Sequence, residues 1–270
     1  MKSVELSVLD GTHDATSALI RVENARRGFR QANGKEVLAI EDLTFDIAEG
    51  DYVAIVGPTG AGKSVFFDCL TGLKSLHGGT IEIAGEKAAI YRNARQGRIS
   101  RIFQEDRLLP WLSAVDNAAL GLQIQGIDKA ERRAIAGAFL DLVGLSAFKN
   151  ALPRELSGGM RQRVNIARAF ATDPEIVLLD EAFSALDDIT AARLREDFKR
   201  VAEAQGKTCI IVTHSIEEAI FLAKRILVFS APAKVIADIR VPAGTWESKA
   251  ATDDLKEEIR RWIAAGARKT

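Results

Sequence analysis

Short apolar runs alternate with helical patterns along most of this 270-residue chain. Tyr52–Val56 is apolar throughout, as expected for a strand that is covered on both faces. Residues 176–179, 209–212 and 226–229 are further runs of this kind. Residues 187–204 and 216–223 lie between them and are apolar at helical spacing. Strands that alternate with helices in this way predict an α/β fold with a parallel sheet.

The regions around this alternation complete the predicted organisation. Residues 19–22 and 43–47 are two further short strands near the start of the chain. The stretch 113–172 is more helical, because residues 130–143 have helical spacing and another helix begins near Ser157. We interpret this helical stretch as an insertion between two halves of the sheet.

The two ends of the chain are expected to lie outside this core. Residues 1–17 are expected to be a loose tail, and residues 231–270 a short extension with one helix at 255–265. One face of that helix carries Leu255, Ile259, Trp262 and Ile263. This face either packs on its own domain or contacts a partner protein, and the sequence leaves both alternatives open.

The composition excludes several classes of function. Lys plus Arg and Asp plus Glu number 37 each, so no net charge draws the chain to nucleic acid or anionic lipid. Residues 1–11 lack the basic start and apolar run of a signal peptide, and no stretch approaches the roughly 18 apolar residues that span a bilayer. We therefore expect a protein that works from the cytoplasm, even if it serves a membrane. Cys69 and Cys209 lie in apolar stretches and are expected to be buried thiols.

A glycine-rich turn between a predicted strand and a predicted helix indicates phosphate binding. Its residues, which fit the pattern G-x-x-x-x-G-K-[ST], are Gly57, Pro58, Thr59, Gly60, Ala61, Gly62, Lys63 and Ser64. The glycines let backbone N–H groups close around phosphate oxygens, and the following helix, expected over residues 63–73, adds oriented donors. Lys63 is suited to the β- and γ-phosphates, and Ser64 to Mg²⁺. Many NTPases share such a P-loop, so other residues have to identify the class.

Two carboxylates follow the predicted strand at 176–179. Asp180 and Glu181 thus stand at the carboxyl edge of the expected sheet, where open α/β folds bind their ligands. We interpret Asp180 as a ligand of Mg²⁺ and Glu181 as the group that orients the water attacking the γ-phosphate. Alone, the pair fits two solvated acids equally well, but the P-loop favours the catalytic interpretation.

A second glycine-containing helix start identifies the class. Residues 156–163 read Leu-Ser-Gly-Gly-Met-Arg-Gln-Arg, in which Ser157 is expected to cap a helix opened by Gly158 and Gly159. This resembles the L-S-G-G-Q signature of ABC ATPases, with Met160 in place of the glutamine. The resemblance implies the ABC ATPase fold over residues 18–230, with an N-terminal antiparallel β portion and a helical subdomain at about 105–172. It also implies a head-to-tail dimer, in which Ser157, Gly158 and Gly159 of one subunit close on the nucleotide of the other.

The remaining elements of that family occur in order. Gln104 looks like the glutamine that senses Mg²⁺ and faces the permease, and Asp187 like the loop residue that links the two sites. His214 looks like the switch histidine that bonds the γ-phosphate. Phe29 resembles the aromatic residue that stacks on adenine, where tyrosine or tryptophan is commoner.

One segment resembles a particular subgroup of this family. Residues 103–111 are similar to the F-Q-x-x-x-L-L-P-W segment of nitrate, sulfonate and taurine importer ATPases, and the pair at 116–117 and residues 152–156 fit the same group. In such importers this region contacts a coupling helix of the permease. Leu108, Leu109 and Trp111 would then form a docking surface. The alternative is that these side chains pack in the core of the helical subdomain.

Two features depart from that group. Phe66 and Phe67 stand where smaller aliphatic residues are usual, so the packing behind the P-loop must differ. Residues 86–101 carry Arg92, Arg95, Arg98 and Arg101, which we interpret as a solvated face rather than as ligands. These departures leave the transported solute open.

The resemblance implies an ATP-hydrolysing subunit of an ABC importer that uses ATP and Mg²⁺. Its implied partners are a second ATPase subunit, an integral membrane permease and, indirectly, a solute-binding protein, without nucleic acid, at the cytoplasmic face of the membrane. Three alternatives share parts of the pattern: an exporter or lipid-transport ATPase, a soluble ABC ATPase that remodels a protein assembly, and a P-loop kinase of a small molecule. The last should lack the Leu-Ser-Gly-Gly element.

Overall fold

The computed structural model describes residues 18–30, 34, 36–88 and 97–267, and the chain divides into two compact units. The first unit combines the N-terminal part of the chain to Tyr91 with the C-terminal part from His214. The second unit comprises Arg92–Thr213. The expected tail at 1–17 lies outside the described residues.

An antiparallel sheet forms one half of the first unit. Its strands follow the order β2 (Glu36–Ala48), β1 (Ala18–Arg30), β4 (Gly78–Ile83) and β5 (Glu86–Lys87). Val22 pairs with Phe45 on one side of β1 and with Ile81 on the other, and every pairing in this sheet is antiparallel. Ile20 and Val22 are buried in alternation, whereas Ala25 and Gly28 follow at a spacing of three residues, where the pairing with β2 shifts in register.

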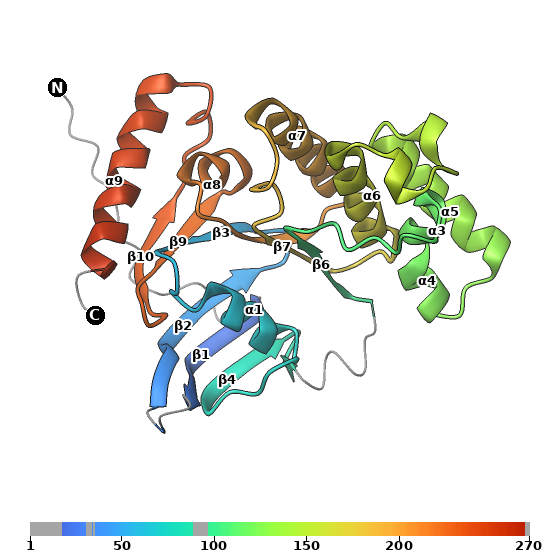
Figure 1. The fold of residues 1–270 in the computed structure, drawn as a ribbon. Helices are drawn as coiled ribbons and strands as arrows, with labels where there is room; N and C mark the ends of the chain where they lie inside the picture. Colours follow the sequence, from blue (N-terminus) through green and yellow to red (C-terminus); the bar gives the residue numbers. More distant parts are fainter. Residues whose placement is uncertain (1–17, 31–33, 35, 89–96, 268–270) are drawn as a thin grey trace. The chain divides into compact units, whose positions relative to one another are not determined.

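The other half of the first unit contains β3 (Tyr52–Val56), β9 (Arg225–Phe229) and β10 (Val235–Arg240). β3 runs parallel to β9, and β10 runs antiparallel to it. Among the residues described for this unit, the helices are α1 (Lys63–Leu70), α8 (Ile216–Leu222) and α9 (Lys249–Ala267). Figure 1 shows α9, in red, lying beside α8, β9 and β10, which it contacts.

An aromatic cluster fixes α1 to the first unit. Phe66 and Phe67 are fully buried, and the Phe66 ring lies 5.5 Å from Phe45 and 6.2 Å from Phe229, measured between centroids. The cluster therefore ties the helix that follows the P-loop to β2 and β9. Such pairs add roughly 0.5–1.5 kcal/mol each beyond the burial of their surface.

Three parallel strands and a helical region form the second unit. β7 (Ile176–Asp180) lies between β6 (Ile99–Phe103) and β8 (Thr208–Val212). The helices are α3 (Ala114–Ala118), α4 (Leu120–Ile124), α5 (Lys129–Leu142), α6 (Gly158–Ala171) and α7 (Asp188–Ala204). Two short 3₁₀ segments, Ser146–Phe148 and Pro153–Glu155, link α5 to α6. α6 packs against α3, α5 and α7, and Figure 1 shows α6 and α7 side by side.

The predicted fold class is confirmed: the protein is α/β, with parallel strands, an antiparallel β portion and a helical insertion. The sequence pattern missed β4, β6 and β10, because their apolar runs are interrupted by glycine or charged residues. The burial predicted for Cys69 and Cys209 is also confirmed, and burial raises the pKa of the Cys69 thiol. Over the part of the chain that the structure describes, no helix is long and apolar enough to cross a membrane.

The C-terminal helix packs on its own unit through part of its apolar face. Leu255 and Ile259 are buried, whereas Trp262 is 37% exposed. The predicted helix at 255–265 lies within α9, which begins earlier. Packing on its own domain therefore accounts for Leu255 and Ile259 but leaves the edge of Trp262 in solvent.

Candidate active site

The P-loop connects β3 to α1 within the first unit, and its backbone leaves no space for side chains at two glycines. A Cβ on Gly57 would lie 2.5 Å from the carbonyl oxygen of Phe229. A Cβ on Gly62 would lie 2.2 Å from the carbonyl oxygen of Ala39, and Gly62 has a φ of +77°. Since real Cβ atoms do not approach so closely, only glycine allows this turn.

Lys63 closes the loop from inside. Its side chain is buried, and Nζ donates hydrogen bonds to the carbonyl oxygens of Gly57 at 2.8 Å and Pro58 at 3.0 Å. The ammonium group is thus held within the turn, next to the N-terminus of α1. Ser64, the second residue of that helix, is exposed. A buried cation and the positive end of a helix dipole together favour a phosphate.

The mouth of the P-loop is open. Thr59 and Gly60 are exposed, and a Cβ on Gly60 would meet no atom within 4 Å. Ala61 is buried and its N–H donates to the carbonyl oxygen of Pro58. The loop therefore has a packed inner side and a free outer side, as a cradle for an anion requires.

The first unit also holds Phe29 and His214. Phe29 is 36% exposed near the end of β1, and the cationic groups of Arg27 and Lys74 lie 5.2 and 5.5 Å from its ring centroid. The ring is thus accessible in a positive environment, which suits a base that carries phosphates. His214 is exposed, directly before Ser215, the N-cap of α8.

The paired carboxylates lie in the second unit, at the carboxyl end of β7. Asp180 is the last residue of that strand, and Glu181 follows it with a φ of +50°. The N–H of Glu181 donates to the carbonyl oxygen of Val212 at 2.9 Å, and its own carbonyl accepts from the hydroxyl of Ser184 at 2.8 Å. A positive φ in a residue other than glycine costs roughly 1–3 kcal/mol and is concentrated at functional sites. Glu181 is therefore held in a strained conformation by bonds on both sides.

Asp180 has a charged neighbour that the sequence pattern did not predict. Nη2 of Arg101 lies 2.5 Å from Oδ2 of Asp180, and only 12% and 15% of the two side chains are exposed. The prediction that Arg101 belongs to a solvated face is wrong. β6 pairs with β7 and brings the arginine under the carboxylate. Arg98 is 45% exposed and pairs with Glu175, while Arg92 and Arg95 lie outside the described residues.

The Leu-Ser-Gly-Gly segment begins α6. Ser157 is its N-cap, and the Ser157 hydroxyl accepts a hydrogen bond from the N–H of Met160 at 3.3 Å. A Cβ on Gly159 would lie 2.7 Å from Cγ2 of Thr190, in the first turn of α7. The glycine therefore allows a close approach of the two helix starts. Ser157 itself is exposed, whereas Gly158 is partly covered by Leu186.

Asp187 caps the neighbouring helix. Its carboxylate accepts a hydrogen bond from the N–H of Thr190 at 3.0 Å, and this bond lowers the pKa of Asp187 below its usual value. The capping carboxylate at the start of α7 therefore remains ionised at neutral pH.

Gln162, a buried polar side chain of α6, binds the backbone next to two predicted site residues. Nε2 of Gln162 donates to the carbonyl oxygens of Phe103 at 3.1 Å and Ala182 at 2.7 Å. It thus links the residue before Gln104 to the residue after Glu181. Gln104 itself is exposed. Gln162 was not among the predicted site residues, although a polar residue in the apolar face of a helix is a signal for such a role.

A second link lies nearer the C-terminal end of α6, at Arg168. Arg168 donates to the carbonyl oxygens of Asp106 at 2.8 Å and Arg107 at 3.0 Å, and to Oδ1 of Asn165 at 2.7 Å. Burial lowers the pKa of Arg168, because the charged form loses water. Arg161 adds an ion pair with Asp106 at 2.8 Å. The segment after Gln104 is thus fixed to the signature helix.

The apolar segment at 108–111 presents one large side chain to solvent. Trp111 is 71% exposed, which rules out core packing for this residue, whereas Leu108 and Leu109 are partly covered. The fully buried amide of Asn117 supports the turn: it donates to the carbonyl oxygens of Leu109 and Leu112 and accepts from the N–H of Leu109. A rigid turn with an exposed indole is suited to contact a partner.

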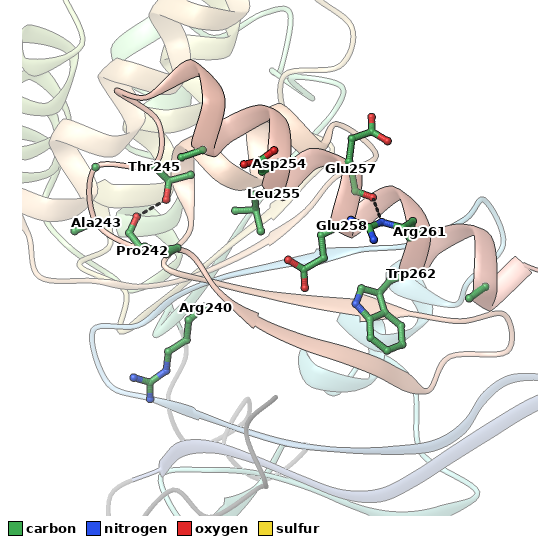
Figure 2. A pocket seen from close by; sticks show the side chains of 13 residues that line it. Arg240, Pro242, Ala243, Thr245, Asp254, Leu255, Glu257, Glu258, Arg261 and Trp262 are labelled. Atoms are coloured by element: carbon green, nitrogen blue, oxygen red, sulfur yellow. Dashed lines mark hydrogen bonds between the residues drawn. The ribbon is translucent and has the colours of Figure 1, made fainter. Parts of the chain in front are cut away.

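A separate groove of about 900 Å³ runs along α9 in the first unit (Figure 2). Its charged lining residues are Arg240, Asp254, Glu257, Glu258 and Arg261, and Trp262 lies at one end. Nε of Arg261 donates to the carbonyl oxygen of Glu257. Because carboxylates outnumber guanidinium groups, this groove offers no cradle for a polyphosphate.

The described residues do not form a metal site from protein side chains alone. Among the described residues, no group of three or more His, Cys, Asp or Glu side chains could hold a metal ion. The hydroxyl of Ser64 and the carboxylate of Asp180 remain as oxygen donors of the type that Mg²⁺ prefers when phosphates supply other ligands.

The chain is similar to known ATPases over most of its length. The family model described as ABC transporter matches residues 40–184. The taurine import ATP-binding protein TauB of Rhizobium johnstonii is 43% identical over 220 residues, which are 81% of this chain and 82% of the relative. TauB of Pseudomonas aeruginosa strain UCBPP-PA14 is 39% identical over 217 residues, 80% of this chain and 79% of its own. A dimeric ATP-binding cassette solved in a post-hydrolysis state with ADP and phosphate superposes with a TM-score of 0.73 at 30% identity, covering 83% of this chain and 99% of its own.

Proposed function

Because this chain belongs to the ABC transporter family, as the ATP-hydrolysing subunit of an importer, we propose specific roles for its P-loop, its paired carboxylates and its Leu-Ser-Gly-Gly helix start. The observation that carries the proposal is the presence of two helix starts suited to anions, at α1 and α6, in one chain. One binds the polyphosphate of its own nucleotide, and the other is free to meet the nucleotide of a second subunit.

ATP binds with its phosphates in the P-loop. The backbone N–H groups of the loop and of the start of α1 face the β- and γ-phosphates, and Lys63 exchanges its carbonyl partners for phosphate oxygens. Phe29 stacks on the adenine, and the positive groups beside the ring favour the nucleotide.

Hydrolysis depends on positioning and electrostatics. Glu181 orients the attacking water, while His214 and Lys63 stabilise the charge on the transferred phosphoryl group. Ser64, Asp180 and Gln104 are the residues that would hold Mg²⁺, directly or through water. When bound, Mg²⁺ would neutralise negative charge on the phosphates.

Two copies of the chain act as a pair. Ser157, Gly158 and Gly159 of one subunit close on the γ-phosphate held by the P-loop of the other, and Asp187 links the two sites. A homodimer is the simplest assembly, since the chain carries both the P-loop and the signature. A related cassette has been solved as a dimer in two structures, which supports the proposal.

Closure of the pair is transmitted to a membrane permease through the exposed turn at 108–111. Trp111 is the centre of this docking surface, because it is a large aromatic side chain on a turn that Asn117 holds rigid. The chain therefore works as a peripheral subunit at the cytoplasmic face of the membrane. A solute-binding protein would deliver the solute to the permease.

The solute is proposed to be a small sulfonate of the taurine type. The support comes from the relatives named as taurine import proteins, which match about four fifths of this chain. The solute itself would be selected by the permease and the binding protein.

Permease docking is tested by comparing Trp111→Ala with Ile124→Ala in a tagged pull-down from gently solubilised native membranes. The two side chains are equally exposed, at 71%, in the same unit, so Ile124→Ala controls for the loss of an exposed apolar group. We expect Trp111→Ala to retain ATPase activity in isolation but to recover at least about tenfold less permease, as for an interface hot spot.

The proteins recovered with the unmodified chain decide between the alternatives. A multi-span permease whose deletion abolishes uptake of labelled taurine would support the importer and its solute. A permease that only exports, or only soluble partners, would contradict the importer assignment.

A further inference from the structure

The ion pair between Arg101 and Asp180 places a cation on the carboxylate to which we assign the metal. We propose that Arg101 is an internal counterion, which occupies the Asp180 carboxylate and has to be displaced when the divalent metal of the nucleotide binds. This inference rests on the proposed role of Asp180. It assigns a function to Arg101, the third residue of β6.

The register of the two strands explains how the side chains meet. Phe103 pairs with Asp180 and Arg101 with Leu178, in parallel alignment. Residues two apart lie on the same face of a strand, so Arg101 and Phe103 share a face, and Arg101 starts about 6–7 Å before the level of Asp180. An extended arginine side chain covers that distance along the strand and ends at the carboxylate.

The ion pair is short and largely withdrawn from water. Nη2 of Arg101 lies 2.5 Å from Oδ2 of Asp180, and the side chains are 12% and 15% exposed. At such low exposure the attraction between the charges is much stronger than between surface groups, and an unpaired carboxylate would be costly. Arg101 therefore pairs with the Asp180 carboxylate in the absence of metal.

An aromatic ring holds the guanidinium in place. The Cζ atom of Arg101 lies 4.9 Å from the centroid of the Phe103 ring, and that of Arg107 lies 3.8 Å from it. Cation–π contacts of this kind favour a fixed position of the planar group. The guanidinium of Arg101 is thus preorganised next to the Asp180 carboxylate.

A divalent metal and this guanidinium compete for one carboxylate. If Asp180 binds the metal, directly or through water, the two cations repel each other at short distance unless Arg101 moves away. Displacing the arginine then consumes part of the binding free energy of the metal. The chain should consequently need more metal for half-saturation than a variant with a neutral side chain at position 101.

The same two strands provide a matched control. Arg98 and Glu175 form an ion pair at 3.1 Å just before β6 and β7, at the end opposite to Asp180, with side chains 45% and 32% exposed. Arg98→Met removes an arginine–carboxylate pair from the same strand pair but leaves the Asp180 carboxylate with its partner.

The experiment measures metal binding directly, with Mn²⁺ as the probe. Free Mn²⁺ is followed by electron paramagnetic resonance during titration of the full chain in the presence of a non-hydrolysable ATP analogue. We expect Arg101→Met to lower the Mn²⁺ concentration at half-saturation by about tenfold, the scale of a partly buried ion pair, with Arg98→Met within about twofold of the unmodified chain. Arg101→Gln, which is shorter and polar, should shift half-saturation in the same direction. It provides the measurement if circular dichroism shows that Arg101→Met does not fold.

The outcomes separate the two proposals. Unchanged or weaker Mn²⁺ binding in a folded Arg101→Met or Arg101→Gln, with the unmodified chain binding both analogue and metal, would overturn the counterion role and leave the proposed function intact. If the unmodified chain binds the analogue but no Mn²⁺, the assignment of Asp180 falls, and the counterion role falls with it.

Discussion

Single residues define the chemistry of this protein through close backbone contacts and unusual backbone conformations. Gly62 lies so close to the backbone of β2 that no side chain fits, and Glu181 has a positive φ that hydrogen bonds on both sides maintain. Such strain is typical of sites that need one fixed geometry. In our proposal Gly62 belongs to the phosphate cradle, and Glu181 follows Asp180, the proposed metal ligand.

The requirement for glycine in the P-loop is tested by Gly62→Ala against Gly50→Ala. Both glycines have a φ near +77°, but a Cβ on Gly50 would meet no atom within 4 Å. Gly50→Ala should cost about 1 kcal/mol of unfolding free energy for the backbone conformation alone. Gly62→Ala should cost about 1–3 kcal/mol more, because of the clash with Ala39, and should also abolish nucleotide binding.

Chemical denaturation gives the unfolding free energies, and fluorescence of a labelled ATP analogue gives the affinities. Equal stability of the two variants, or normal nucleotide binding by Gly62→Ala, would show that the loop tolerates a side chain and that the cradle is misassigned.

At the scale of elements, α6 connects two parts of the proposed site. Its first turn carries the Leu-Ser-Gly-Gly segment, and its buried polar side chains hold the backbone that follows β6 and β7. A shift of α6 would therefore displace the segment around Gln104. This gives a physical route between the signature and the docking turn within the second unit.

This link is tested by Arg168→Met, with Arg200→Met as its control. Arg168 donates to two carbonyl oxygens after Gln104, whereas Arg200 is 65% exposed and pairs with Asp197. Arg168→Met should lower the unfolding free energy by about 2 kcal/mol, because the carbonyl groups of Asp106 and Arg107 and the amide oxygen of Asn165 lose a charged donor. Hydrogen exchange should accelerate across residues 104–109 in this variant alone. Unchanged exchange there would mean that α6 does not hold the segment.

Local sequence patterns predicted some of these elements, whereas contacts between residues far apart in the chain could not be predicted. The P-loop, the carboxylate pair and the cap at Ser157 are local patterns, so spacing and turn chemistry were sufficient to place them on a strand end and helix starts. β6 escaped prediction because Arg101 interrupts its apolar run. The ion pair of Arg101 with Asp180 depends on the register of strands 79 residues apart, which no local pattern encodes. The same holds for the buried amide of Gln162, whose partners are the backbone carbonyl groups of Phe103 and Ala182.

For the whole molecule, we propose that two copies enclose ATP between the P-loop of one and the signature of the other. The balanced net charge of the chain gives no general attraction between copies. Association should therefore depend on the nucleotide, whose phosphates face a helix start from each subunit. Blocking hydrolysis at Glu181 should then accumulate the closed pair.

Control variants distinguish nucleotide binding from dimer formation. Glu181→Gln should bind ATP normally but lose at least about a hundredfold in turnover, as expected when a general base is removed. Glu175→Gln, at the other end of β7, should keep turnover within about twofold. The double variant Glu181→Gln with Ser157→Arg should bind ATP but remain monomeric, because the larger side chain at position 157 blocks the signature.

The most direct measurement is the mass of Glu181→Gln in solution by light scattering, with and without ATP and Mg²⁺. Our account predicts a change from 29.3 kDa to twice that mass when the nucleotide is added, and no change in the double variant. A Glu181→Gln protein that binds ATP but stays at 29.3 kDa would contradict the shared-site mechanism.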